Sequence, residues 1–77
     1  MLDSSDQEDE TLARIDQFIA EGEQRILRVR HAVAKLDAKG FDTSAGKDVL
    51  ATMTRSVENL RAHRRMAVSR AWRRLFR

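Results

Sequence analysis

The nine-residue stretch LDAKGFDTS, residues 36–44, decides how this chain folds. Gly40 is a natural end for a helix, because glycine adopts the left-handed conformation found after many helices at little steric cost. Phe41 then occupies the position at which a Schellman cap makes its hydrophobic contact, here back onto Leu36. The next three residues can each cap a following helix: Asp42, Thr43 or Ser44. A connection this short, with its turn near residues 40–43, predicts two helices that lie side by side and antiparallel.

Apolar residues recur at helical spacing on both sides of this turn. Before it, a 3-4-3-4-3-4-3 spacing runs through Leu12, Ile15, Ile19, Gly22, Ile26, Val29, Val33 and Leu36. After it, the same alternation runs through Leu50, Met53, Val57, Leu60, Arg64, Ala67 and Ala71. This is the heptad pattern whose a and d positions form the seam between two helices. We therefore predict an all-α, coiled-coil-like antiparallel two-helix hairpin.

The expected boundaries follow from the same pattern. The first helix should cover about residues 11–39 and the second about residues 44–75, with residues 1–10 forming an acidic, frayed N-terminus. Ser5 and Glu8 also make a capping box, which would allow the first helix to begin earlier.

The turn also predicts a pairing register. If it is centred near residue 43, facing residues have numbers that add to about 86, as expected for antiparallel neighbours joined by a short loop. This register pairs Ile26 with Leu60, Val29 with Val57, and Gly22 with Arg64. Two charged pairs fit it as well: Asp37 near Lys47, and Glu23 near Arg61.

The C-terminal part departs from the ideal repeat. The stem of Arg64 should cross the seam over Gly22, with its head reaching Glu21 or Glu23. Beyond Arg64 the larger apolar residues are Val68, Trp72 and Leu75, a spacing that resembles a stutter. We expect Trp72 and Leu75 to cover Leu12 and Ile15.

Charge is distributed very unevenly along the 77 residues. Residues 1–23 hold eight acids and one base, residues 24–58 seven bases and four acids, and residues 59–77 seven arginines and no acid. Such asymmetry is found in chains with a basic tail for nucleic acid or membranes. It is also expected where an acidic and a basic segment fold against each other, as residues 9–25 and the C-terminal arginines would in the hairpin.

Several classes of function find no support in the sequence. The segment GFDTSAGK, residues 40–47, only superficially resembles a phosphate-binding loop, because the glycines are too far apart and no strand precedes it. His31 and His63 lack metal-binding spacing, and no carboxylate pair is placed for acid–base catalysis. We expect no enzymatic activity, no cofactor and no metal. The absence of cysteine, of a signal peptide and of a long apolar run favours a cytoplasmic location.

A two-helix hairpin has a single seam, which is little core for an independent domain. Apolar residues nevertheless remain outside the seam, and we take the large ones as a candidate interaction surface: Phe18, Leu27, Val49, Met66, Trp72 and Phe76. They predict a homodimer that forms a four-helix bundle, or docking onto a helix of a partner protein.

The arginine-rich end supports an alternative function. Arg65, Arg70, Arg73, Arg74 and Arg77 are candidate contacts for nucleic acid or for an anionic membrane surface. The simpler interpretation is that these arginines complement the acidic first helix.

Parts of the sequence resemble a group of short uncharacterised alphaproteobacterial, rhizobial-type helical proteins. The resemblance covers about residues 12–66 and is carried by EGEQRI (residues 21–26), GFDT (residues 40–43), VLATM (residues 49–53) and LRAHRR (residues 60–65). It implies a small, soluble bacterial helical protein and no particular activity. The arginine-rich C-terminus with Trp72 lies outside it.

Overall fold

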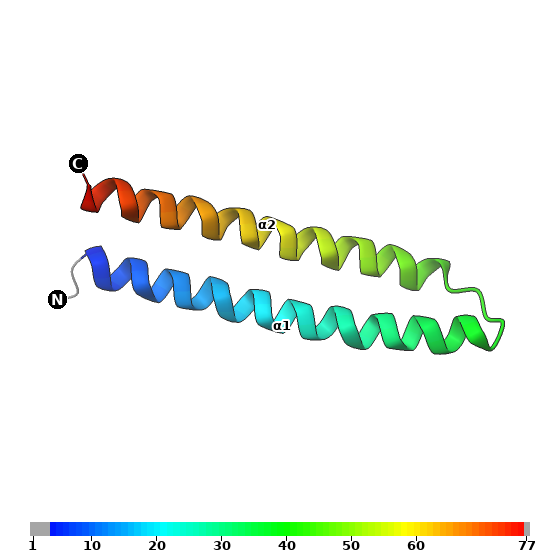
Figure 1. The fold of residues 1–77 in the computed structure, drawn as a ribbon. Coiled ribbons are helices and arrows are strands. Elements are labelled where there is room, and N and C mark those ends of the chain that lie inside the picture. Colours follow the sequence, from blue (N-terminus) through cyan, green and yellow to red (C-terminus); the bar gives the residue numbers. More distant parts are fainter. Residues whose placement is uncertain (1–3, 77) are drawn as a thin grey trace.

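The chain folds into two long helices that run antiparallel. The computed structural model describes the backbone of residues 4–76 and the side chains of residues 7–76. Helix α1 (Ser4–Ala38) and helix α2 (Ser44–Leu75) pack along their full lengths, so the start of α1 and the end of α2 lie at the same end of a rod (Figure 1). The rod measures 58 × 21 × 13 Å. The predicted all-α hairpin is therefore confirmed.

The boundary of α2 agrees with the prediction, and that of α1 does not. Helix α1 begins at Ser4, seven residues before the expected start at Thr11, so residues 4–10 belong to the helix. Side chains before Gln7 lie outside the described residues, as do residues 1–3, so the capping box of Ser5 stays a prediction.

The turn ends α1 with a Schellman motif, as the glycine predicted. Gly40 has a φ of +85°, and its N–H donates to the carbonyl oxygen of Asp37 at 3.0 Å. The N–H of Phe41 donates to the carbonyl oxygen of Leu36 at 3.1 Å. These two bonds satisfy carbonyl groups that the end of a helix would otherwise leave without partners.

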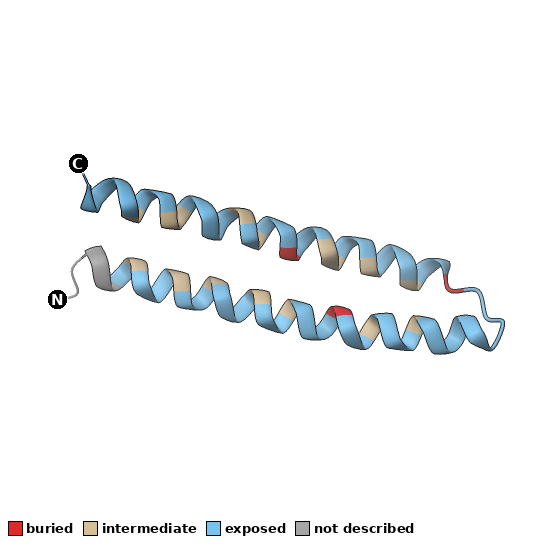
Figure 2. Ribbon diagram, viewed as in Figure 1, coloured by how far each residue is buried: buried red, intermediate tan, exposed pale blue. Residues whose placement is uncertain are grey.

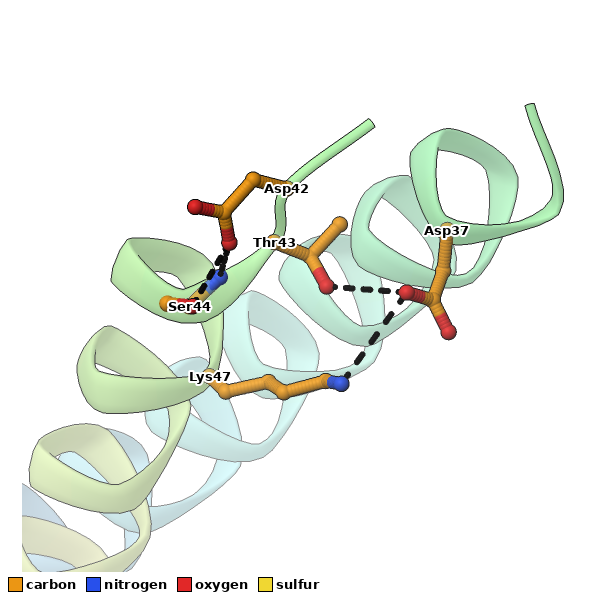
Figure 3. Close-up of polar contacts among 5 residues, drawn as sticks. All are labelled: Asp37, Asp42, Thr43, Ser44 and Lys47. Carbon is orange, nitrogen blue, oxygen red and sulfur yellow. Dashed lines mark hydrogen bonds and ion pairs between the residues drawn. The ribbon is translucent and has the colours of Figure 1, made fainter. Parts of the chain in front are cut away.

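The start of α2 is held by two neighbouring residues with separate roles. An oxygen of the Asp42 carboxylate accepts hydrogen bonds from the Ser44 hydroxyl at 2.6 Å and the Ser44 N–H at 3.0 Å (Figure 3). These bonds, helped by the charge of Lys47, hold the pKa of Asp42 below its usual value. Thr43 stands at the N-cap position, but its hydroxyl donates across the turn to Asp37 at 3.0 Å. The turn is thus tied to both helices.

The seam runs along the predicted heptad positions. In α1, every described side chain that is not exposed lies at an a or d position, from Glu8 to Val33 (Figure 2). The best-buried apolar residues are Ile26, 8% exposed, and Val57, 5% exposed, with Thr43 closing the seam at the turn. The core is therefore one narrow row of side chains.

The predicted register is wrong by one heptad. A β-carbon added at Gly22 would lie 2.6 Å from Cγ2 of Val57, and one added at Gly46 would lie 2.7 Å from Cγ2 of Val33. The residue numbers of both pairs add to 79, not 86. Gly22 therefore faces Val57 and not Arg64. By the same sum, Ile26 lies opposite Met53 and not opposite Leu60. Val29 lies opposite Leu50 and not opposite Val57.

A slip of seven residues keeps every a and d position on the seam, so apolar periodicity alone cannot detect it. The glycines distinguish the two registers, because only the observed one places a β-branched valine in each gap that a glycine leaves. Long charged side chains do not distinguish them. The predicted pairs Asp37–Lys47 and Glu23–Arg61 both form, since such side chains reach up or down by a turn.

The C-terminal end of α2 also differs from expectation. The slip moves it toward the start of α1, so Arg64 donates to Asp16 and not to Glu21 or Glu23. The seam continues through Ala67 and Ala71, which are partly buried. Trp72 is 58% exposed and Leu75 is 74% exposed, so neither covers Leu12 or Ile15. The stutter interpretation is wrong for these two residues.

Candidate interaction surfaces

The hairpin has two long faces, one on each side of the seam. In an antiparallel pair the e positions of the two helices meet on one side and the g positions on the other. The Asp37–Lys47 and Glu23–Arg61 ion pairs join e positions and so mark the first side. A shallow groove with Glu23 and Arg61 on its walls also contains Leu27 and Thr54. A second groove, with Phe18, Arg25 and Ser56, marks the opposite side.

The first side is rich in small and apolar residues, and we call it the alanine face. It is formed by the b and e positions, and its uncharged members are Ala13, Ala20, Leu27 and Ala34 of α1 and Ser44, Ala51, Thr54, Val68, Trp72 and Leu75 of α2. Its charges nearly balance. Among the side chains of residues 7–76, the acids are Asp9, Asp16, Glu23, Asp37 and Glu58, and the bases are Arg30, Lys47, Arg61 and Arg65.

The opposite side, formed by the c and g positions of the two helices, is strongly cationic, and we call it the basic face. Its cations are Arg14, Arg25, Arg28 and Lys35 of α1 and Arg70 and Arg73 of α2. All six are exposed, and Glu21 is the one acid at these positions within the two helices. Arg70 lines a depression together with Gln7 and Thr11, which places it on this side of the seam.

The ion pairs between the helices use acids that lie outside the basic face. Over the part of the chain whose side chains are described, four pairs join the helices: Asp37–Lys47, Glu23–Arg61, Asp16–Arg64 and Glu8–Arg74. Each joins partly exposed groups, so each contributes at most about 1 kcal/mol. Their larger effect is on the distribution of charge. Each pair neutralises an arginine or lysine of α2 with an acid of α1, and none of the neutralised cations lies on the basic face.

The six apolar residues predicted as an interaction surface are all at least half exposed, but they do not form one patch. Phe18 lies in the groove on the basic side, and Val49 is at a g position on that side. Leu27 lies in the groove on the alanine side, and Met66, at a c position, lines a depression on α2 at the outer edge of the basic side. Only Trp72 and Phe76 are brought together, with stacked rings whose centroids are 4.6 Å apart.

The five predicted arginines are also divided. Arg65, Arg70 and Arg73 line one depression with Met66 on the outer side of α2. Arg74 pairs with Glu8 through Nη1 and Oε1 at 2.6 Å, so its charge is already compensated. Arg77 lies outside the described residues.

The described residues offer no enclosed chemical site. The depressions on the surface are open, and no group of three His, Asp or Glu side chains among residues 7–76 is placed to share a metal ion. Neither α1 nor α2, over the part that the structure describes, has a segment apolar and long enough to cross a membrane. The arrangement is suited to contact with large surfaces.

Comparison with known proteins found no matching family model, no matching curated protein and no matching solved structure. The resemblance to short alphaproteobacterial proteins therefore stays a prediction.

Sequence reasoning missed the basic face, although its signal was present. The predicted set of cationic contacts included only arginines of the C-terminal segment. It left out the four cations that α1 contributes at its own c and g positions. Assigning every charged residue a heptad position, and not only the apolar ones, would have separated a balanced face from a cationic one.

Proposed function

We propose that this chain is a non-enzymatic assembly module that acts by self-association, with two hairpins forming a four-helix bundle. The observation that carries the proposal is the small core of a single hairpin. Among the described residues only Ile26 and Val57 are buried apolar side chains, and no large side chain is fully buried. Nine large apolar residues are at least 45% exposed. One seam of this size supplies little stability by itself.

The exposed area fits a second copy. A compact monomer of this mass exposes about 4,800 Å², whereas the hairpin exposes 6415 Å². The excess is roughly 1,600 Å² per chain, or about 3,000 Å² for two chains, which is typical of permanent homodimers. The radius of gyration is 17.6 Å, compared with about 11–12 Å for a compact chain of this length.

The charge distribution favours the alanine face as the interface. A two-fold dimer brings the same patch of both chains together, so a face with net charge repels its own copy. The basic face carries six cations against Glu21. The alanine face carries five acids and four bases among the described side chains, and its alanines at positions 13, 20 and 34 allow another helix to approach closely. Leu27, 54% exposed, lies in the middle of this row.

The test compares two equally exposed residues on opposite faces. Leu27 and Phe18 are each 54% exposed. We expect wild-type protein and Phe18→Glu to elute as dimers in size-exclusion chromatography with light scattering, and Leu27→Glu to elute as a monomer or to lose helicity. Circular dichroism of each variant separates dissociation from unfolding.

Three outcomes would contradict the proposal in different ways. A stable, helical wild-type monomer at micromolar concentration would overturn self-association. Dissociation by Phe18→Glu alone would move the interface to the other face. A monomeric hairpin that cross-links in its host cells to one other protein would replace the second copy with a partner helix. We place the module in the cytoplasm, in keeping with the absence of cysteine.

A further inference from the structure

The basic face is an array of charge built by both helices. Arg14, Arg25, Arg28 and Lys35 project from α1, and Arg70 and Arg73 from α2. In the observed register, the two arginines of α2 lie opposite the first turns of α1. The six cations are therefore spread over roughly 43 Å of the rod, at about 1.5 Å per residue.

Among the side chains of residues 7–76, the ion pairs of the hairpin do not compensate these six charges. The four pairs use Glu8, Asp16, Glu23 and Asp37, and none of them involves a cation of the basic face. The one acid at a c or g position of the helices is Glu21. Its carboxylate accepts a hydrogen bond from the Gln17 side chain at 3.1 Å. The face is thus a long, straight, exposed strip with net positive charge.

We propose that the basic face binds the phosphate backbone of double-stranded nucleic acid, without reading its sequence. Five of the six cations are arginines, whose planar guanidinium groups bind phosphate oxygens through two hydrogen bonds. A strip of roughly 43 Å matches about 13 base pairs at 3.4 Å each. Contacts of this kind position a protein on a duplex but carry no sequence information.

Two other polyanions fit the face less well. Single strands are held by aromatic platforms on which bases stack, and Phe18 is the one aromatic residue at the c and g positions of the helices. A membrane surface requires a continuous apolar band that enters the lipid. On the basic face Phe18, Val49 and Met66 are separated by polar and charged residues. The stacked Trp72 and Phe76 lie at b and f positions, away from it.

The basic face remains open whether the chain is a monomer or a dimer through the alanine face. Binding to nucleic acid is therefore independent of the proposed self-association, and a dimer would carry one basic face on each outer side.

The first measurement is the affinity of the whole chain for a fluorescent 20-base-pair duplex of random sequence, by anisotropy between 50 and 200 mM salt. With six phosphate contacts, log K should fall against log salt with a slope of about −5, a loss of about 1,000-fold over this range. Absence of binding at 50 mM salt, or binding that salt does not weaken, would overturn the proposal.

The second measurement uses variants of equal charge. Arg28→Gln with Arg70→Gln removes one cation from each helix on the basic face. Lys39→Gln with Arg55→Gln removes two exposed cations that belong to neither the basic face nor the alanine face. The first pair should reduce the magnitude of the salt slope by about 1.8 and weaken binding more than tenfold at 100 mM salt. The control pair should change affinity less than threefold.

Circular dichroism and light scattering check whether both double variants keep the fold and mass of the wild type, as we expect. Equal losses from the two pairs would mean that net charge and not the basic face determines binding, which contradicts the proposal. Vesicles of phosphatidylserine and phosphatidylcholine provide the remaining comparison. Sedimentation with vesicles in the absence of duplex binding would assign the face to membranes instead.

Discussion

Cγ2 of Val57 packs against the backbone of Gly22, so closely that a β-carbon at Gly22 would lie 2.6 Å from it. This relationship fixes the register of the hairpin, because a methyl group and a glycine leave no room for a slip without opening a gap or creating an overlap. The register in turn decides which charges pair across the seam and which remain on the basic face.

Gly22→Ala tests this contact through the sign of its effect. Alanine improves helix propensity by about 1 kcal/mol, but its methyl overlaps Val57, which costs about 1–3 kcal/mol. We expect a net loss of about 1 kcal/mol in the wild type and a gain of about 1 kcal/mol in a Val57→Ala background, where the overlap is relieved. Urea unfolding of the four proteins at one concentration measures both values. If Gly22 faced Arg64, the substitution would stabilise both backgrounds equally.

Gly40→Ala isolates the conformational requirement of the turn. Gly40 has a φ of +85°, and nothing lies within 4 Å of where its β-carbon would be, so the substitution adds strain without a steric clash. We expect a loss of about 1–2 kcal/mol, the cost of holding an L-residue in the left-handed region. Lys39→Ala, at the preceding position, should change stability by less than about 0.5 kcal/mol. Thermal unfolding of the two variants makes the comparison, and equal small effects would mean that the turn does not need glycine.

Acid should weaken the start of α2 through Asp42. Its pKa in the folded chain lies below its usual value, because the ionised carboxylate accepts the hydroxyl and N–H of Ser44. A group with a lowered folded pKa contributes stability above its unfolded pKa of about 3.9 and loses that contribution as pH falls through the folded value. The wild type should therefore lose more Tm below about pH 4 than Asp42→Asn, which keeps an acceptor oxygen but does not titrate. Parallel Tm curves for the two proteins between pH 2 and 6 would show that the cap does not depend on the charge.

The sequence was sufficient for the fold because its local signals agree. The 3-4 spacing, Gly40 and the polar trio after it all indicate one helix, one turn and one helix, and the turn geometry follows in detail. The register was not accessible from periodicity, since a heptad slip preserves every seam position. The decisive signal was the pair of glycines on the seam. Gly22 and Gly46 each leave space for a larger side chain on the facing helix, and only the observed register places a valine in both spaces.

The candidate surfaces were predicted less well than the fold. Exposure of Phe18, Leu27 and Trp72 followed from their positions outside the seam. These residues lie on different faces because they occupy different heptad positions, and the prediction used only the a and d positions. The role of Arg74 could not be predicted, because its partner Glu8 lies in a segment that we expected to precede the first helix.

The most direct test of self-association is the dependence of thermal unfolding on protein concentration. A hairpin that needs a second copy unfolds and dissociates together, so mass action raises its Tm as concentration increases. We expect Tm, followed by circular dichroism at 222 nm, to rise steadily over a hundredfold increase in concentration, with a mass of about twice 8.9 kDa before unfolding. A Tm that is the same at every concentration, with a mass of 8.9 kDa throughout, would contradict the account.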